Sequence, residues 1–390
     1  MFRKRSYLDW ASAAPVASAA KLAFVRALAH GGNPSSPHRE GVEAKRVLED
    51  ARLKIARLTE VKPAGVIFTS GATEANNLAL QGVVMALRAK GVPAGDIHLL
   101  YLPGAHASVI NTVRTLTSYR IDAEALELRD GRIDVEDFRK KLKPTTRLVV
   151  LDAVCGETGT RYDTRSVRTI LETFAREGGY ERALLHVDAS QASLAAPFDL
   201  TRLAADSVAL DGQKVGGIRG IGALCIRSNV KLAPLMQGGG QEGGLRPGTE
   251  PVALASAFAA ALTEAFEGQA AFMLRAQRSR DQLIALLTAQ LPSLVVNRGR
   301  EGVPHILNFS LPGLDTDYAV MLLDAEGFAV ATKSACEADA EQGSRAVRAL
   351  TGDEARARST LRVSWGPATK ERELKRFAHA LVRTAHFLDR

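Results

Sequence analysis

The sequence predicts an α/β fold: a large domain on a mostly parallel central sheet with helices on both faces, followed by a smaller α+β domain. Short apolar segments rich in β-branched residues alternate with longer helical patterns, which is typical of βαβ units. A length of 390 residues suits two domains that share one site. A composition of 46% hydrophobic and 24% charged residues is that of a globular protein.

The expected elements follow this alternation in order. Apolar runs predict strands at 66–69, 98–101, 147–151, 183–187 and 306–309. Helical periodicity predicts helices from the end of the first strand to about residue 88, from 106, from about 164, from 250 toward 291 and from about 370. A Gly-rich loop at 237–249 separates the two halves. We therefore expect an N-terminal segment, 1–15, that packs with the small domain, a large domain, 16–255, and a small domain, 256–390.

Charge and cysteine content exclude several classes of protein. The net charge of +8 is spread along the chain without interleaved aromatic residues, so no direct contact with nucleic acid is expected. No apolar run reaches the roughly 20 residues of a membrane span, and none follows the basic residues at the start, so we expect a cytoplasmic protein. Three cysteines without a C-x-x-C pair predict neither a disulfide framework nor a metal site.

The stretch FTSGATEANN, residues 68–77, predicts an anion site. A strand ends in small residues and a helix begins. Backbone N–H groups and the Thr73 hydroxyl then meet at the positive end of the helix dipole, which suits a phosphate. The alternative is an ordinary helix that Ser70 or Thr73 caps.

Two later motifs place an acid and an amine after strands. Asp188 ends a hydrophobic strand at the edge where open α/β sheets bind ligands, and a carboxylate there can pair with a protonated heterocyclic nitrogen. A helix cap is the alternative role for Asp188. Lys214 lies in a glycine-rich turn after another strand, where a lysine can form a Schiff base; a surface lysine is the alternative.

Two of the cysteines have contrasting surroundings. Cys336 lies in a polar stretch of small residues beside Lys333, which predicts a mobile loop and a partly ionised, nucleophilic thiol. An incidental exposed cysteine is the alternative. Cys225 lies in an apolar run and is predicted to belong to the core.

In this order the motifs resemble the cysteine desulfurases of the iron–sulfur assembly type, within the class V aminotransferase family of fold-type I pyridoxal-phosphate enzymes. The similarity begins at Tyr7-Leu8-Asp9, continues through GNPSSPH at 32–38 and FTSGATEANN, and ends at LRVSWG, residues 361–366. FTSGATEANN with a downstream Ser-Ala-Cys loop is a specific signature. The resemblance implies the fold-type I PLP-dependent transferase fold.

The resemblance implies a role for each matching residue. Lys214 matches the Schiff-base lysine, and His106 matches the histidine that stacks on the cofactor ring and handles protons, with a helix cap as the alternative. The residues expected to bind other parts of pyridoxal phosphate are Ala72, Thr73, Asp188, Gln191, Gln213 and Thr249. Thr249 is expected to reach the phosphate of the other subunit, which implies a homodimer.

For the substrate, Arg362 matches the clamp of the carboxylate, a task that suits a bidentate guanidinium. Asn33 lies in a substrate-side loop. Cys336 matches the thiol that receives sulfur as a persulfide. The implied reaction converts L-cysteine to L-alanine and passes the sulfur to an acceptor protein, in iron–sulfur cluster assembly or tRNA thiolation.

Two alternatives remain at this point. One is another pyridoxal-phosphate reaction on the same fold, by a selenocysteine lyase, a cysteine-sulfinate lyase or an aminotransferase. The other is a catalytically degenerate homologue that acts by binding partners.

Departures from the family pattern cluster around the expected cofactor. Gly156, in Cys155-Gly156-Glu157, stands where relatives usually have an asparagine that touches the phenolic oxygen. Asp211 and Gln213 replace a serine and a histidine. A carboxylate at position 211 repels a phosphate unless it points away or is protonated. Cys155 is expected to pack beside the ring, with a second sulfur carrier as the alternative.

Two further departures lie in loops. Lys333 replaces a glycine shortly before Cys336, and Gln241 and Gly243 replace a histidine and an arginine in the Gly-rich loop.

Overall fold

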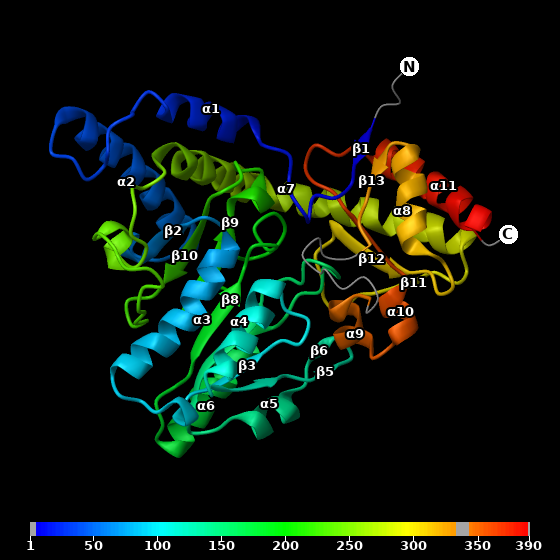
Figure 1. Cartoon of the computed structure of the whole chain (residues 1–390). Coiled ribbons are helices and arrows are strands. Elements are labelled where there is room, and N and C mark those ends of the chain that lie inside the picture. Colours follow the sequence, from blue (N-terminus) through cyan, green and yellow to red (C-terminus); the bar gives the residue numbers. More distant parts are fainter. Residues whose placement is uncertain (1–4, 333–342, 389–390) are drawn as a thin grey trace.

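The computed structural model describes residues 5–332 and 343–388, and its largest element is a seven-stranded sheet (Figure 1). Neighbouring strands follow the order β2 (Val66–Thr69), β10 (Gly222–Ile226), β9 (Ser207–Asp211), β8 (Leu184–Asp188), β7 (Thr146–Asp152), β3 (His98–Tyr101) and β4 (Asp122–Ala125). The pairs in this sheet are parallel except for the two that β10 makes. The predicted mostly parallel sheet is confirmed.

Helices cover both faces of this sheet, which is why its central strands β7 and β8 are apolar and almost entirely buried. The helices α3 (Ala72–Ala89) and α4 (Ala107–Ser118) contact each other, in front of the sheet in Figure 1. The helix α4 connects β3 to β4, whereas α6 (Thr164–Gly178) connects β7 to β8 in the opposite direction across the sheet. Because such crossovers are right-handed, α4 and α6 lie on opposite faces.

One long helix, α7 (Val252–Gln290), runs from the large sheet to the C-terminal part of the chain (Figure 1). The helices α1 (Ser18–Ala27) and α2 (Arg39–Thr59) both pack on α7. The predicted boundary at residue 255 therefore falls inside a continuous helix, and the division of the chain into domains remains a prediction.

The C-terminal part is built on an antiparallel sheet of β11 (Val295–Val296), β12 (Ile306–Ser310) and β14 (Thr360–Ser364). Its helices are α8 (Thr316–Ala325), α9 (Arg345–Thr351), α10 (Glu354–Arg358) and α11 (Glu371–Leu388). The N-terminal strand β1 (Ser6–Tyr7) pairs with β13 (Phe328–Ala329), and Asp9 forms a bridge to Ser364. The chain thus passes along the C-terminal part before it enters the large one. The remaining elements are α5 (Val135–Lys141), β5 (Leu128–Arg129), β6 (Arg132–Ile133) and four short 3₁₀ turns.

The strand β10 was not among the expected elements, and it is the one that runs antiparallel in the large sheet. It carries Cys225, whose side chain is fully buried, so the prediction that Cys225 belongs to the core is confirmed. Among residues 5–332 and 343–388, no helix combines the length and the apolar character that crossing a membrane requires.

Candidate active site

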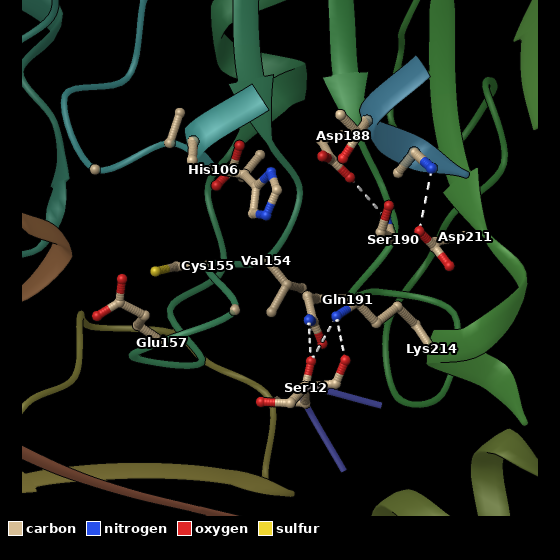
Figure 2. Close-up of a pocket in the computed structure, with 18 of the residues that line it drawn as sticks. Ser12, His106, Val154, Cys155, Glu157, Asp188, Ser190, Gln191, Asp211 and Lys214 are labelled. Carbon is tan, nitrogen blue, oxygen red and sulfur yellow. Dashed lines mark hydrogen bonds between the residues drawn. The ribbon is translucent and has the colours of Figure 1, made fainter. Parts of the chain in front are cut away.

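Three carboxylates end three neighbouring strands at one edge of the large sheet. Asp152 ends β7, Asp188 ends β8 and Asp211 ends β9, and the register places Asp152 beside Asp188. The carboxyl ends of parallel strands are where open α/β sheets bind ligands. A cavity of about 170 Å³ lies at this edge, and all three acids line it. Figure 2 labels Asp188 and Asp211 among the lining residues.

Most of the site residues expected from the sequence meet in this cavity. Its lining includes Ala72, Thr73, His106, Asp188, Gln191, Gln213, Lys214 and Arg362. Asn33 and Thr249 do not line it, and both lie exposed on loops. Cys336 lies outside the described residues.

The N-terminal segment forms one wall of the cavity. Lys214, in the 3₁₀ turn Gly212–Val215, donates from Nζ to the carbonyl oxygens of Ala11 and Ser12, each at 2.8 Å. Gln191 Nε2 donates to the same Ala11 oxygen at 2.8 Å (Figure 2). Two backbone carbonyls near the start of the chain therefore fix the positions of two expected cofactor residues.

Asp188 is held by a buried hydrogen-bond network. Its carboxylate accepts from Asn76 Nδ2 at 2.7 Å and from the Ser190 backbone N–H at 3.0 Å. Because the Asn76 amide nitrogen faces the Asp188 carboxylate, Asn76 Oδ1 is free to accept from His186 Nε2, at 3.0 Å. Burial lowers the pKa of His186 to about 4, so this imidazole is neutral near pH 7. Asp188 therefore stands at the end of a fixed, uncharged chain of donors.

The same network reaches His106, the N-cap residue of α4. Ser108 Oγ accepts from Asn76 Nδ2 at 2.9 Å and lies 2.8 Å from His106 Nδ1. The serine hydrogen therefore points to Nδ1, which also accepts from the Ser108 backbone N–H at 3.2 Å. Burial lowers the pKa of His106, against the opposing effect of Asp188. The neutral imidazole thus carries its proton on Nε2, and His106 is at once a helix cap and a residue of the cavity.

At the N-terminus of α3 an internal carboxylate takes the expected anion position. The N-cap residue is Gly71, so the alternative that Ser70 or Thr73 caps this helix is wrong. Asp211 Oδ2 accepts from the Ala72 backbone N–H at 3.1 Å, the bond drawn at Asp211 in Figure 2, and Asp211 Oδ1 accepts from the Gln213 N–H at 3.0 Å. The departure noted at position 211 therefore points toward the predicted phosphate position.

Arg362, on β14, is buried and also lines the cavity. Its Nη2 donates to Asp9 Oδ1 at 2.8 Å and to Ser12 Oγ at 2.6 Å, and its Nη1 donates to the Gly156 carbonyl at 3.0 Å. Its Nε has no hydrogen-bond partner in the described part of the chain. Three of the five guanidinium N–H groups therefore donate to described residues and fix the side chain in place.

The substitution at 155–156 is accommodated by packing. A Cβ atom on Gly156 would lie 3.1 Å from Gln191 Nε2, so the glutamine side chain takes the space that a larger residue would need. Cys155 also lines the cavity, but burial and the neighbouring acids Glu157 and Asp152 raise its pKa to about 11. A thiol that stays protonated is a poor nucleophile, which favours packing over sulfur transfer for Cys155.

These residues fit pyridoxal phosphate in most respects. The cavity offers an amine for an aldehyde (Lys214), an imidazole to cover a ring (His106) and a carboxylate for a ring nitrogen (Asp188). The buried Ser190 Oγ lines the cavity without a hydrogen-bond partner among the described residues, as expected for a position that contacts a ligand. At the phosphate end, the backbone N–H groups at the start of α3 also fit the cofactor, whereas the Asp211 carboxylate does not.

Sequence reasoning missed several residues of this site. Ala11 and Ser12 carry no motif of their own. Asn76 stood inside the quoted motif without a role, and Asp152 ends a predicted strand just as Asp188 does. These two signals were present in the sequence. Arg345, which follows the segment of Cys336, also lines the cavity.

Comparisons with known proteins agree with this site. The Aminotransferase class-V family model matches residues 6–377. The cysteine desulfurase IscS 1 of Archaeoglobus fulgidus is 32% identical over 96% of this chain and 95% of its own length. The cysteine desulfurase IscS of Methylococcus capsulatus is 33% identical over 97% and 91%. A solved structure of a NifS-like protein superposes with a TM-score of 0.89 at 26% identity, over 98% of this chain and all of that one.

The resemblance and the fold class predicted from the sequence are thereby confirmed. The chain belongs to the class-V aminotransferase family of pyridoxal-phosphate-dependent enzymes and groups within it with the cysteine desulfurases.

Proposed function

We propose that this protein is a cysteine desulfurase that converts L-cysteine to L-alanine and transfers the sulfur to Cys336 as a persulfide. The observation that carries the proposal is the cavity in which Lys214, His106, Asp188 and Arg362 converge at the carboxyl edge of the sheet. The similarity to curated cysteine desulfurases extends over nearly the whole chain and supports the same reading.

Pyridoxal phosphate, when bound, supplies an aldehyde that condenses with amines and a ring that accepts electrons from the substrate carbon. In the proposal Lys214 holds the aldehyde and Asp188 holds a proton on the ring nitrogen. Asn76 and Ser190 keep the Asp188 carboxylate in position through bonds of 2.7 and 3.0 Å. His106, neutral and carrying its proton on Nε2, covers the ring and moves protons near the substrate.

Arg362 binds the substrate carboxylate in this proposal. A bidentate guanidinium contact matches the planar geometry of a carboxylate. Asp9 already occupies Nη2 of Arg362. Substrate binding therefore exchanges one carboxylate for another, and the N-terminal segment that supplies Asp9 and Ser12 adjusts when cysteine binds.

Cys336 lies outside the described residues, but both flanks of its segment are bonded to residues around the cavity. On one side Ala331 forms a bridge to Arg362, and on the other Ser344 Oγ donates to Glu157 at 2.5 Å. Arg345 and Glu157 themselves line the cavity. In the proposed step the Cys336 thiolate attacks the substrate sulfur, a sulfur–sulfur bond forms, and the carbon–sulfur bond breaks. The electron pair stays on the substrate carbon, which then takes up a proton to give alanine.

We further propose a homodimer. Asn33 and Thr249 are the two expected residues among the described ones that this chain does not bring to its own cavity. The loops that carry them flank one shared hollow, whose lining includes Pro34, Ser35, Gly240 and Gln241. Exposed apolar side chains on α1, among them Leu22 and Val25, offer surface for a second copy.

The persulfide is delivered, in this proposal, to an acceptor protein for iron–sulfur cluster assembly or tRNA thiolation. A cytoplasmic location is part of the same proposal, because a sulfur carrier requires a free thiol and a reducing compartment preserves it.

The test is to incubate the cofactor-supplemented protein with L-cysteine and reductant, and to measure sulfide and alanine. We expect equal amounts of both products, and their loss in Lys214→Ala and Cys336→Ala. Cys225→Ala, a core thiol away from the cavity, and Cys155→Ala are expected to retain turnover. Turnover that survives in Cys336→Ala would assign the reaction to another member of the same family, such as a selenocysteine or sulfinate lyase.

A further inference from the structure

The carboxylate of Asp211 lies where the phosphate of a bound cofactor is expected. It accepts the Ala72 backbone N–H at the first turn of α3, and it lines the cavity together with Ala72, Thr73 and Gln213. The hydrogen bonds to Asp211 come from neutral backbone groups, those of Ala72 and Gln213. A helix N-terminus attracts an anion through its unpaired N–H groups and its dipole, and here the protein supplies that anion itself.

A phosphate and an ionised Asp211 cannot share this position without a large electrostatic cost. Two unit charges about 4 Å apart repel by about 4 kcal/mol at the effective dielectric constant typical of a protein surface, and a phosphate ester carries more than one charge. Removal of the carboxylate's charge by a proton eliminates that repulsion. The protonated acid also becomes a donor, so its O–H can bond to a phosphate oxygen while the Ala72 N–H passes to the phosphate.

The surroundings of Asp211 favour proton uptake over permanent ionisation. The side chain is largely buried, and burial is the main cause that raises the pKa of Asp211. The Ala72 N–H, the charge of Lys214 and the Gln213 N–H oppose that effect, whereas Asp188 on the neighbouring strand adds to it. Other titratable groups near this end are the neutral His106 before α4, and Glu74 in the first turn of α3, which is paired with Arg246.

We propose that Asp211 competes with the cofactor phosphate for the N-terminus of α3, so that binding of pyridoxal phosphate is coupled to the uptake of one proton by Asp211. This inference rests on the proposed function. Its consequence is that the affinity for the cofactor falls as the pH rises, by up to about tenfold per pH unit. This fall adds to any change in affinity that the titration of Lys214 or of the phosphate causes.

The test compares two ligands that differ only in the phosphate. The full-length apoprotein is titrated with pyridoxal phosphate and with pyridoxal, and binding is followed by absorbance at several pH values between 6 and 9. We expect Asp211→Asn to bind pyridoxal phosphate at least tenfold more tightly than wild type at high pH, with a smaller gain at low pH. Pyridoxal is expected to change by less than twofold. Asp211→Ser serves as a second variant.

Asp315→Asn is the matched control, because the Asp315 carboxylate also accepts a backbone N–H at the start of a helix, that of Tyr318 in α8, but does not line the cavity. An Asp211→Asn variant whose affinity for pyridoxal phosphate is unchanged or weaker at every pH, with Asp211→Ser in agreement, would overturn the inference. An equal gain for pyridoxal would do the same, because the phosphate would then be irrelevant. If wild type binds pyridoxal phosphate through Lys214 and only the gain is missing, the proposed function stands. If neither ligand binds to any form, both proposals fail.

Discussion

Replacement of Asn76 by alanine removes the centre of the network behind the cavity. The Asn76 side chain is fully buried and bonds to Asp188 at 2.7 Å, to Ser108 at 2.9 Å and to His186 at 3.0 Å. Asp188 retains the Ser190 N–H, but His186 loses the acceptor of its Nε2 proton. The substitution therefore leaves buried polar groups without partners and opens a small cavity.

The expected cost is large for one substitution. A buried polar group that loses its partner costs about 1–3 kcal/mol, and a charged one costs more. With His186 and one oxygen of Asp188 both affected, we expect Asn76→Ala to lower the free energy of unfolding by about 3–5 kcal/mol. That is a substantial fraction of the roughly 5–15 kcal/mol that stabilises a typical protein.

Chemical denaturation of the apoprotein, followed by circular dichroism, measures this loss. Asn111→Ala, at an exposed position on α4, is the matched control and is expected to change stability by less than about 0.5 kcal/mol. A loss below about 1 kcal/mol for Asn76→Ala would refute the argument, because it would mean that water or a neighbouring side chain replaces the amide without cost.

Three further substitutions test other parts of the structure. Glu242→Gln breaks a buried ion pair with Arg52, whose two bonds measure 2.7 and 2.8 Å, and we expect a loss of about 3 kcal/mol in denaturation. Burial lowers the pKa of His305 to about 3. Below pH 6.5 this imidazole is therefore protonated in the unfolded chain and stays neutral in the native one. Stability is then full above pH 6.5 and falls as the pH drops, and His305→Phe is expected to reduce that fall by about 1.4 kcal/mol per pH unit. Ser108→Ala removes the O–H that donates to His106 Nδ1 and leaves only the longer bond from the backbone N–H, so we expect nitrogen NMR to show a mixture of imidazole tautomers.

Each of these substitutions has a matched control and an outcome that contradicts it. Glu43→Gln breaks an exposed pair and is expected to cost less than about 0.5 kcal/mol; an equal cost for both glutamates contradicts the argument from burial. His379→Gln, at an exposed position, is expected to leave the acid profile unchanged, and an unchanged profile for His305→Phe contradicts its assignment. Ser118→Ala lies at the far end of α4, and a single Nε2–H tautomer that persists in Ser108→Ala shows that the serine does not select it.

The sequence by itself determined the α/β class, the strands at 66–69 and 98–101, and the placement of Asp188 and Lys214 after strands. These features follow from local periodicity and from short motifs, because an apolar run or a glycine-rich turn fixes its own backbone conformation. The strand β10 escaped this reasoning, because a short apolar run does not by itself distinguish a strand from other buried structure.

Only the tertiary structure decided which groups surround those residues. Ala11 and Ser12 are about 200 positions from Lys214, yet they accept both of its described hydrogen bonds. The bond from Ala72 to Asp211 likewise spans 139 positions. Such contacts depend on the order and register of the strands and on the path of the N-terminal segment. Long-range packing sets these features, and the local sequence does not encode them. For this reason the sequence predicted a phosphate position, and the fold showed that a carboxylate of the protein already occupies it.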